Sequence, residues 1–250
     1  MNVFAVPGVP EVRPGDDLAD LIADRVDLRP DDVVLVASTV VSKAEGRQAD
    51  LADFPAGERA AAIAARLERL TGEDKDPRFA QAVLAESEAL LTEAPFLLTV
   101  TRFGHVTVNA GIDRSNVPDA DLLLLPEDPT ASARALAERL DAPVIVTDTS
   151  GRPFRLGQRG VAVGWAGMPA CRDWRGERDR DGRELDVTVQ AVVDELASAA
   201  NLVAGEGAGG TPVTVVRDWS FGDHEGSDQL FREREGDVVR QALEQWEYEP

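Results

Sequence analysis

The chain has 250 residues, 43% of them hydrophobic, which is typical of a globular protein of one or two domains. Its formal net charge of −20 disfavours binding to nucleic acid, which requires a basic surface, and to anionic membranes. Because no apolar stretch approaches the ~20 residues of a membrane span and no signal peptide is recognisable, we expect a cytoplasmic protein.

The positive charges are almost all arginine, since lysine occurs only at Lys43 and Lys75. A single cysteine, Cys171, excludes an internal disulfide, and two histidines provide no zinc cluster, so any metal must be held by oxygen. The large excess of carboxylates predicts a protein adapted to high salt, in which the repulsion between surface carboxylates is screened.

The hydrophobic pattern predicts short strands and amphipathic helices in an irregular order. Strands are expected over Asn2–Val6 and Val33–Ala37, with a helix over Asp16–Val26 between them. Further along the chain we expect helices over 58–70 and 79–91, hairpin strands over 96–102 and 105–108, a strand over 122–125, a helix over 131–140, strands over 144–148 and 161–163, a helix over 187–203, a strand over 212–216 and a helix over 238–246.

This order indicates an α+β fold with mixed, largely antiparallel sheets and flanking helices, because strands and helices do not alternate regularly and the hairpin implies antiparallel pairing. A change in composition near residues 126–143 predicts two lobes within a single domain over residues 1–250.

Two apolar runs each end in an aspartate. One is VTVNAGID, from Val106 to Asp113, and the other is VIVTD, from Val144 to Asp148. If both runs are buried strands, each aspartate places a hard anionic oxygen at the mouth of a sheet, where Mg²⁺ or Mn²⁺ can bind with substrate phosphates. The alternative is that each aspartate only caps a turn or a helix.

Lys43 lies just beyond the predicted strand that ends at Ala37, in a segment that begins with Ser38 and Thr39. This segment is not a Walker A loop, but two hydroxyls and an ammonium suit phosphate oxygens. The alternative is a solvated surface lysine. Because the chain uses arginine for nearly all its positive charge, we favour the functional interpretation.

A glycine-rich segment, AGEGAGGT, runs from Ala204 to Thr211. Its glycines allow backbone amides to approach a ligand closely, although a flexible connector has the same composition. Glu206 is its only carboxylate. Beside a phosphate it would cause repulsion unless a cation intervened, so Glu206 is a candidate metal ligand.

Several other residues have weaker patterns. Arg152, Arg155 and Arg183 could bind an anionic substrate, with solvated surface arginines as the alternative. We expect His105 to be a strand residue and Cys171 a small apolar filler, because no histidine is near enough in sequence to activate the thiol.

Five segments together resemble the coenzyme F-420-0:L-glutamate ligase, or gamma-glutamyl ligase, family. They cover nearly the whole chain in the family's order: Ser38 to Arg47, Gly111 to Val117 (GIDRSNV), Asp148 to Arg155 (DTSGRPFR), Asp181 to Leu185 (DGREL) and the GEG loop at Gly205. A departure follows the last core strand, where Arg217-Asp218-Trp219 replaces the family's frequent Arg-Gly.

The resemblance implies a GTP-dependent amide ligase that adds L-glutamate to the carboxylate tail of a deazaflavin coenzyme precursor, coenzyme F-420-0, and then a second, γ-linked glutamate. GTP would first convert the carboxylate to an acyl phosphate, which the amine of glutamate attacks. It also implies two divalent cation sites for Mg²⁺ or Mn²⁺, a K⁺ ion, one catalytic domain over residues 1–250 and an intertwined homodimer.

Site residues follow from the matching motifs. The resemblance implies nucleotide contacts at Val9, Pro10, Glu11, Val12, Ser38, Thr39, Lys43 and Asn116. It implies a phosphate-cradling loop of Ala204, Gly205, Glu206, Gly207, Ala208, Gly209, Gly210 and Thr211. Asp113 and Asp148 would hold one divalent ion, Thr149 and Glu206 a second, and the catalytic residues would be Lys43, Asp113 and Asp148.

Two other classes share these features. A metal-dependent phosphohydrolase would use the same oxygen-rich site to pass phosphate to water, and a non-catalytic GTP-binding sensor would bind the nucleotide without turnover. A glutamate-dependent product distinguishes the ligase from both.

Overall fold

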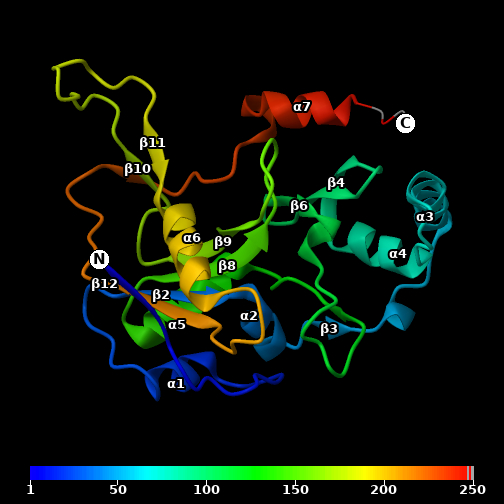
Figure 1. Ribbon diagram of the computed structural model, residues 1–250, viewed down its shortest axis with the longest axis horizontal. Coiled ribbons are helices and arrows are strands. Elements are labelled where there is room, and N and C mark those ends of the chain that lie inside the picture. The colour runs from blue at the N-terminus through cyan, green and yellow to red at the C-terminus, as the bar shows by residue number, and fades with distance from the viewer. Residues whose placement is uncertain (247, 249–250) are drawn as a thin grey trace. The chain divides into compact units, whose positions relative to one another are not determined.

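The computed structural model describes residues 1–246 and 248, and the chain divides into two compact units (Figure 1). Unit 1 comprises residues 1–46 and 126–230. Unit 2 comprises residues 47–125 and the described residues from 231 onward. Among the described strands only β2 and β8 pair in parallel, so the predicted α+β class with largely antiparallel sheets is confirmed.

Unit 1 is built around a five-stranded sheet of order β1-β12-β2-β8-β9. Its strands are β1 (Asn2–Ala5), β12 (Val213–Arg217), β2 (Val33–Ala37), β8 (Val144–Ser150) and β9 (Arg159–Ala166). The central strands are rich in buried valine, as expected for strands covered on both faces. All five lie at or within a few residues of their predicted positions.

Helices cover this sheet, and a smaller sheet adjoins it. The helices of unit 1 are α1 (Leu18–Ala23), α2 (Ser38–Ala44), α5 (Pro129–Leu140) and α6 (Val192–Ala204), and the smaller sheet has the order β11-β10-β13 with β10 (Cys171–Asp173), β11 (Val189–Ala191) and β13 (Gly226–Ser227). Helices α5 and α6 both pack against β9, shown in green in Figure 1.

A β-bulge lets β9 receive one helix on each face. The register shifts so that Gly164 pairs with Val146, whereas Gly160 pairs with Thr149. Because β8 positions 146 and 149 point to opposite faces, the two glycines also face opposite ways. A Cβ on Gly164 would meet the backbone of Pro129 in α5 at 2.3 Å, and one on Gly160 would meet the carbonyl of Ala197 in α6 at 2.4 Å.

The helix predicted over residues 187–203 is shorter than expected. Residues Val189–Ala191 instead form β11, which pairs with β10, and α6 begins only at Val192. The backbone of Ala191 has φ −78° and ψ 78°, so the helix is interrupted there. The amphipathic pattern extends across this break, and only pairing with β10 reveals it.

Unit 2 combines helices with two small sheets. Its elements are β3 (Gln48–Ala49), a 3₁₀ turn η1 (Leu51–Asp53), α3 (Glu58–Thr71), α4 (Pro77–Ala85), β4 (Ser87–Thr92), β5 (Leu98–Thr101), β6 (Val106–Val108), the 3₁₀ turn η2 (Asn109–Gly111), β7 (Leu122–Leu123), the 3₁₀ turn η3 (Arg234–Gly236) and α7 (Val238–Glu244). The predicted hairpin is confirmed as β5 and β6, and β4 extends it to three strands.

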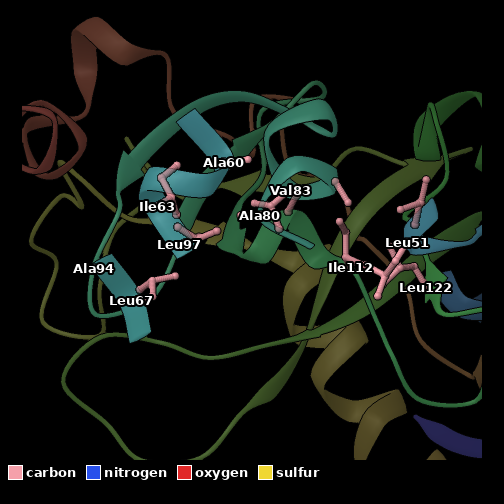
Figure 2. Close-up of a cluster of buried hydrophobic side chains, with 13 residues drawn as sticks. Leu51, Ala60, Ile63, Leu67, Ala80, Val83, Ala94, Leu97, Ile112 and Leu122 are labelled. Atoms are coloured by element: carbon pink, nitrogen blue, oxygen red, sulfur yellow. The ribbon is translucent and has the colours of Figure 1, made fainter. Parts of the chain in front are cut away.

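One hydrophobic cluster forms the core of unit 2 (Figure 2). Ile63 and Leu67 from α3 and Val83 from α4 belong to it together with Leu97, and Leu51, Ile112 and Leu122 complete the cluster. The apolar residues of α3 and α4 recur at three- and four-residue spacing, which explains why these helices were predictable.

The helix predicted over residues 79–91 is wrong in its second half. Helix α4 ends at Ala85, and Ser87–Thr92 forms β4, which pairs with β5 through two register irregularities. The sequence SEALLT favours a helix by intrinsic propensity, so partner pairing overrides the local preference here.

The run VTVNAGID is also not one strand. Strand β6 ends at Val108, and Asn109 and Ala110 both have φ 55°, a left-handed conformation that breaks an extended run. Asp113 then pairs with Leu123 in an isolated bridge. The expectation of a continuous strand ending in Asp113 is therefore corrected, whereas VIVTD lies within β8 as expected.

The backbone at Asp218, directly after β12, is left-handed. Asp218 has φ 57°, a conformation that glycine adopts more readily, at the position where the family frequently has glycine. Within the described residues, no helix combines the length and the apolar character needed to cross a bilayer.

Candidate functional site

The predicted site segments of unit 1 gather at one edge of the five-stranded sheet. Strand β1 is antiparallel to β12, β12 is antiparallel to β2, and β2 is parallel to β8, so the carboxyl ends of β1, β2 and β8 share an edge. The amino ends of β12 and β9 lie at the same edge. Ligands of open sheets that contain parallel strands bind outside the carboxyl ends of those strands.

This topology brings together segments that are distant in sequence. Residues 9–12 follow β1, Ser38 opens α2 directly after β2, and the 204–211 loop precedes β12. Two backbone hydrogen bonds fix the arrangement: Val6 N donates to Val213 O at 2.9 Å, and Ala37 N donates to Pro212 O at 2.8 Å.

Asp148, in β8, contacts the start of α2. Ser38 Oγ donates to Asp148 Oδ1 at 3.2 Å, and Ser38 itself is buried. Because Ala37 and Thr147 are register partners in the parallel β2–β8 pair, the next residue of each strand is placed side by side. The structure thus brings together a predicted nucleotide contact and a predicted metal ligand.

Lys43 is not a surface lysine. Its side chain is only 9% exposed, and Nζ donates to Glu11 Oε1 at 2.5 Å, whereas the Glu11 side chain is 63% exposed. The ammonium is therefore held inside unit 1, where its partner carboxylate connects it to the 9–12 segment.

Thr149 and Glu206, which are predicted to share one ion, are in direct contact. Thr149 Oγ1 donates to Glu206 Oε1 at 3.1 Å. Because successive residues of a strand point to opposite faces, Thr149 contacts the α6 side of the sheet, whereas Asp148 contacts α2.

The 204–211 loop is exposed along most of its length and closes on itself. Thr211 Oγ1 donates to Ala204 O at 3.1 Å, and Gly205, the C-cap of α6, has φ 73°. A Cβ on Gly207 or Gly210 would meet no other atom within 4 Å, so no packing reason requires glycine at these two positions. An open loop of this kind leaves its backbone amides accessible to a ligand.

The remaining two predicted residues belong to unit 2. The Asp113 carboxylate accepts hydrogen bonds from Ser115 N at 2.7 Å and from Ser115 Oγ at 2.8 Å, which closes a tight turn. Asn116 follows with φ 54°. Asp148 belongs to unit 1, so the sharing of one ion by Asp113 and Asp148 stays a prediction.

The oxygen donors of the site fit a divalent cation only in part. Within the part of the chain that the structure describes, no group of three or more His, Cys, Asp or Glu side chains forms a metal site. Thr149 and Glu206 offer two hard oxygens. Mg²⁺ commonly takes one or two carboxylates and completes its shell with waters and substrate phosphates. The residues therefore fit an ion that arrives with a nucleotide, and they do not form an all-protein cage.

The arginines considered for an anionic substrate are exposed. Arg152 and Arg155 flank an exposed Phe154, and Arg183 lies in a turn in which its backbone N donates to Asp179 Oδ1 at 2.9 Å. Cys171 is buried, and burial raises the pKa of its thiol, which agrees with its interpretation as an apolar filler.

One residue of the site was missed by sequence reasoning. Asn201 Nδ2 donates to Glu206 Oε1 at 2.6 Å and lies 3.3 Å from Thr149 Oγ1. From the sequence alone, an asparagine in an amphipathic helix is predicted to be an ordinary exposed residue. The only signal in the sequence is its place one turn before the glycine-rich loop.

Comparison with known protein families places the chain in a class of ligases. Residues 8–218 match the family described as F420-0:Gamma-glutamyl ligase. The chain belongs to this family, as the motifs indicate.

Curated relatives match the whole chain or nearly all of it. This chain is 72% identical over 249 residues to the coenzyme F420:L-glutamate ligase of Natronomonas pharaonis. The alignment covers 100% of this chain and 98% of that relative. The protein of the same name from Halorubrum lacusprofundi is 72% identical over 250 residues, with 100% of both chains covered. The one from Archaeoglobus fulgidus is 47% identical and covers 97% of this chain and 98% of its own.

Proposed function

We propose that this chain is a GTP-dependent ligase that joins L-glutamate to the carboxylate tail of coenzyme F-420-0 and then adds a second, γ-linked glutamate. Family membership supports the ligase class. The observation that carries the proposal further is the gathering at one sheet edge of two oxygen pairs, Ser38 with Asp148 and Thr149 with Glu206, and the buried ammonium of Lys43.

An activated intermediate is required by the chemistry. A carboxylate does not form an amide directly, because oxide is a very poor leaving group. Transfer of the γ-phosphoryl group of GTP to the tail carboxylate breaks the bond between the γ-phosphorus and its bridging oxygen, forms an acyl phosphate and releases GDP. The amine of glutamate then attacks the acyl carbon, and inorganic phosphate leaves.

The residues of unit 1 would divide this work. Lys43 would offset negative charge on the phosphates, and Ser38 would hydrogen-bond to a phosphate oxygen from the start of α2. The backbone amides of the 204–211 loop would surround the phosphates, and residues 9–12 would contact the nucleotide.

Divalent cations would be held by Thr149 with Glu206, and by Asp148. The charge of Mg²⁺ or Mn²⁺ would neutralise the phosphates as the anionic carboxylate approaches the γ-phosphate. We further propose a K⁺ ion and a homodimer, for which the support is the family resemblance alone.

The proposal is tested by incubating the protein with the deazaflavin precursor, GTP, Mn²⁺ and L-glutamate at high KCl, with mass spectrometry of the products. We expect precursor with one and then two glutamates, and GDP formation that depends on both the precursor and glutamate. GDP formation that is independent of glutamate, with no amide product, would indicate a phosphohydrolase. No consumption of GTP with all substrates present would indicate a binding protein. Light scattering of the same sample tests the homodimer.

A further inference from the structure

Asn201 lies in the last turn of α6, between the two predicted ligands of one cation. Its Nδ2 atom is 2.6 Å from Glu206 Oε1 and 3.3 Å from Thr149 Oγ1, and the two oxygens are 3.1 Å apart. The three polar atoms thus form a closed triangle. Neither the hydroxyl nor the amide removes the negative charge of the carboxylate, which stays available to a cation.

The position of Asn201 is set by the close packing of α6 on β9. Helix α6 approaches β9 at Gly160, which is the register partner of Thr149. A Cβ on Gly160 would lie 2.4 Å from Ala197 O and 2.9 Å from Asn201 Cβ, so only glycine permits this approach. Ser198 Oγ then donates to Gly160 O at 2.8 Å, which fixes the last turns of α6 beside Thr149.

Glu206, in contrast, lies in the exposed 204–211 loop. Asn201 restrains that loop twice, because its carbonyl accepts a hydrogen bond from Gly205 N at 2.9 Å and its amide donates to the Glu206 carboxylate. Without the amide, a glutamate flanked by Gly205 and Gly207 would have to be ordered each time an ion binds, at a cost in conformational entropy.

We infer that Asn201 is a positioning residue, which holds the Glu206 carboxylate beside the Thr149 hydroxyl as a preorganised ligand pair for a divalent cation. The inference rests on the proposed function, which requires that cation. Partners of metal ligands in other proteins act in this way, by fixing the orientation of the ligand before the ion arrives.

The test measures Mn²⁺ binding rather than turnover, by calorimetry and electron paramagnetic resonance, with a non-hydrolysable GTP analogue present. Asn201→Ala should weaken one class of Mn²⁺ site by about 10–100-fold, the size known for the loss of such partners. Affinity for the GTP analogue in EDTA should stay unchanged. Leu202→Ala is the matched control, since Leu202 is the 86% exposed neighbour in the same helical turn and should bind Mn²⁺ as the wild type does.

Asn201→Asp separates positioning from direct ligation. A carboxylate of the same shape cannot donate to Glu206 and repels it, so a positioning role predicts a loss at least as large as that of the alanine variant. Mn²⁺ binding at or above the wild-type affinity in Asn201→Asp would show that the residue is itself a ligand, and would overturn the inference.

Glu206→Gln serves as the reference variant. If it loses one class of Mn²⁺ site and Asn201→Ala does not, the positioning role is wrong while the proposed cation site stands. If Glu206→Gln binds Mn²⁺ as the wild type does, both the cation site at Glu206 and the inference are wrong. Far-ultraviolet circular dichroism checks folding, which alanine within a helix should preserve.

Discussion

Lys43 illustrates how the environment of one side chain changes its interpretation. Its ammonium is buried and paired with the exposed carboxylate of Glu11. A chain that uses arginine for all but two of its basic residues has a lysine at this position, where a planar guanidinium would not replace the compact point charge of the ammonium.

We expect Lys43→Ala to lower kcat/KM for GTP by an amount equal to about 2–4 kcal/mol of transition-state stabilisation, because one charge that stabilises the transition state is lost. Folding should be preserved, since the exposed Glu11 stays hydrated without its partner. Lys43→Arg should recover only part of the activity. Lys75→Ala changes the only other lysine, a half-buried residue whose partner Glu73 is exposed, and is the matched control. Equal GTP kinetics in both alanine variants would contradict a role for Lys43.

Asp148 combines a structural contact with its predicted role in metal binding. Ser38 Oγ can donate to an amide oxygen as well as to a carboxylate, so an asparagine here retains that contact and loses the charge.

Asp148→Asn should therefore reduce ligation by about 100-fold or more, the effect of removing a charge-stabilising group, with little change in melting temperature. Added Mn²⁺ should restore activity only in part. The matched control is Asp141→Asn, at the exposed C-cap of α5, where φ is 49° and asparagine is well tolerated. Near-normal turnover of Asp148→Asn at ordinary Mn²⁺ would remove Asp148 from the metal site.

At the scale of elements, the contact between α6 and β9 holds both the core of unit 1 and part of the site. Gly160→Ala should destabilise the protein by about 1–3 kcal/mol, because the methyl group overlaps the backbone of α6. Thermal unfolding measures the loss. Gly151→Ala, in open space directly after β8, is the stability control and should melt like the wild type. If the two variants melt at the same temperature, the approach of α6 is looser than described.

The hairpin β5–β6 contains a buried histidine. His105 precedes β6, its ring lies 5.8 Å from that of Phe231, and its Nε2 has no hydrogen-bond partner among the described residues. Burial lowers the pKa of His105 from 6.5 to about 4. Between pH 4 and pH 6.5 this histidine is therefore protonated in the unfolded chain and neutral in the folded chain. The free energy of unfolding consequently falls as the pH drops from 6.5 toward 4.

His105→Phe should remove this contribution while preserving an aromatic ring beside Phe231. Relative to its own value at pH 7.5, the variant should lose about 2 kcal/mol less stability at pH 5 than the wild type loses. Urea unfolding at fixed high salt provides the measurement. Parallel pH profiles for the two proteins would show that His105 is protonated equally in the folded and unfolded states.

At the scale of the whole molecule, we expect the net charge of −20 to make the stability of the folded state depend on salt. Carboxylates repel one another over about 8 Å at 0.15 M salt but only about 3 Å at 1 M. Dialysis into low salt should cause loss of folded structure, which circular dichroism would measure. Sucrose should not replace KCl, because it does not screen charge. Full stability at low salt would contradict adaptation to high salt.

The sequence by itself determined the fold class, the family and most elements. Strands such as Val33–Ala37 and Val144–Ser150 are continuous β-branched runs, and helix α3 repeats its apolar residues with helical period, so local pattern was sufficient there. Residue type and local context, at the ends of two predicted strands and in the glycine-rich loop, likewise identified Lys43, Asp148 and Glu206 as candidates. Local pattern failed at Ser87–Thr92 and at Val189–Ala191, where helix-forming sequences pair as strands.

Only the tertiary structure decided which side chains meet. The parallel pairing of β2 with β8 places Ser38 beside Asp148, 110 positions apart in sequence. The bulge in β9 and the bare backbone of Gly160 bring α6 close enough for Asn201 to reach Thr149 and Glu206. Hydrophobic periodicity encodes which face of an element is buried. It does not encode the strand order and register that determine a residue's distant neighbours.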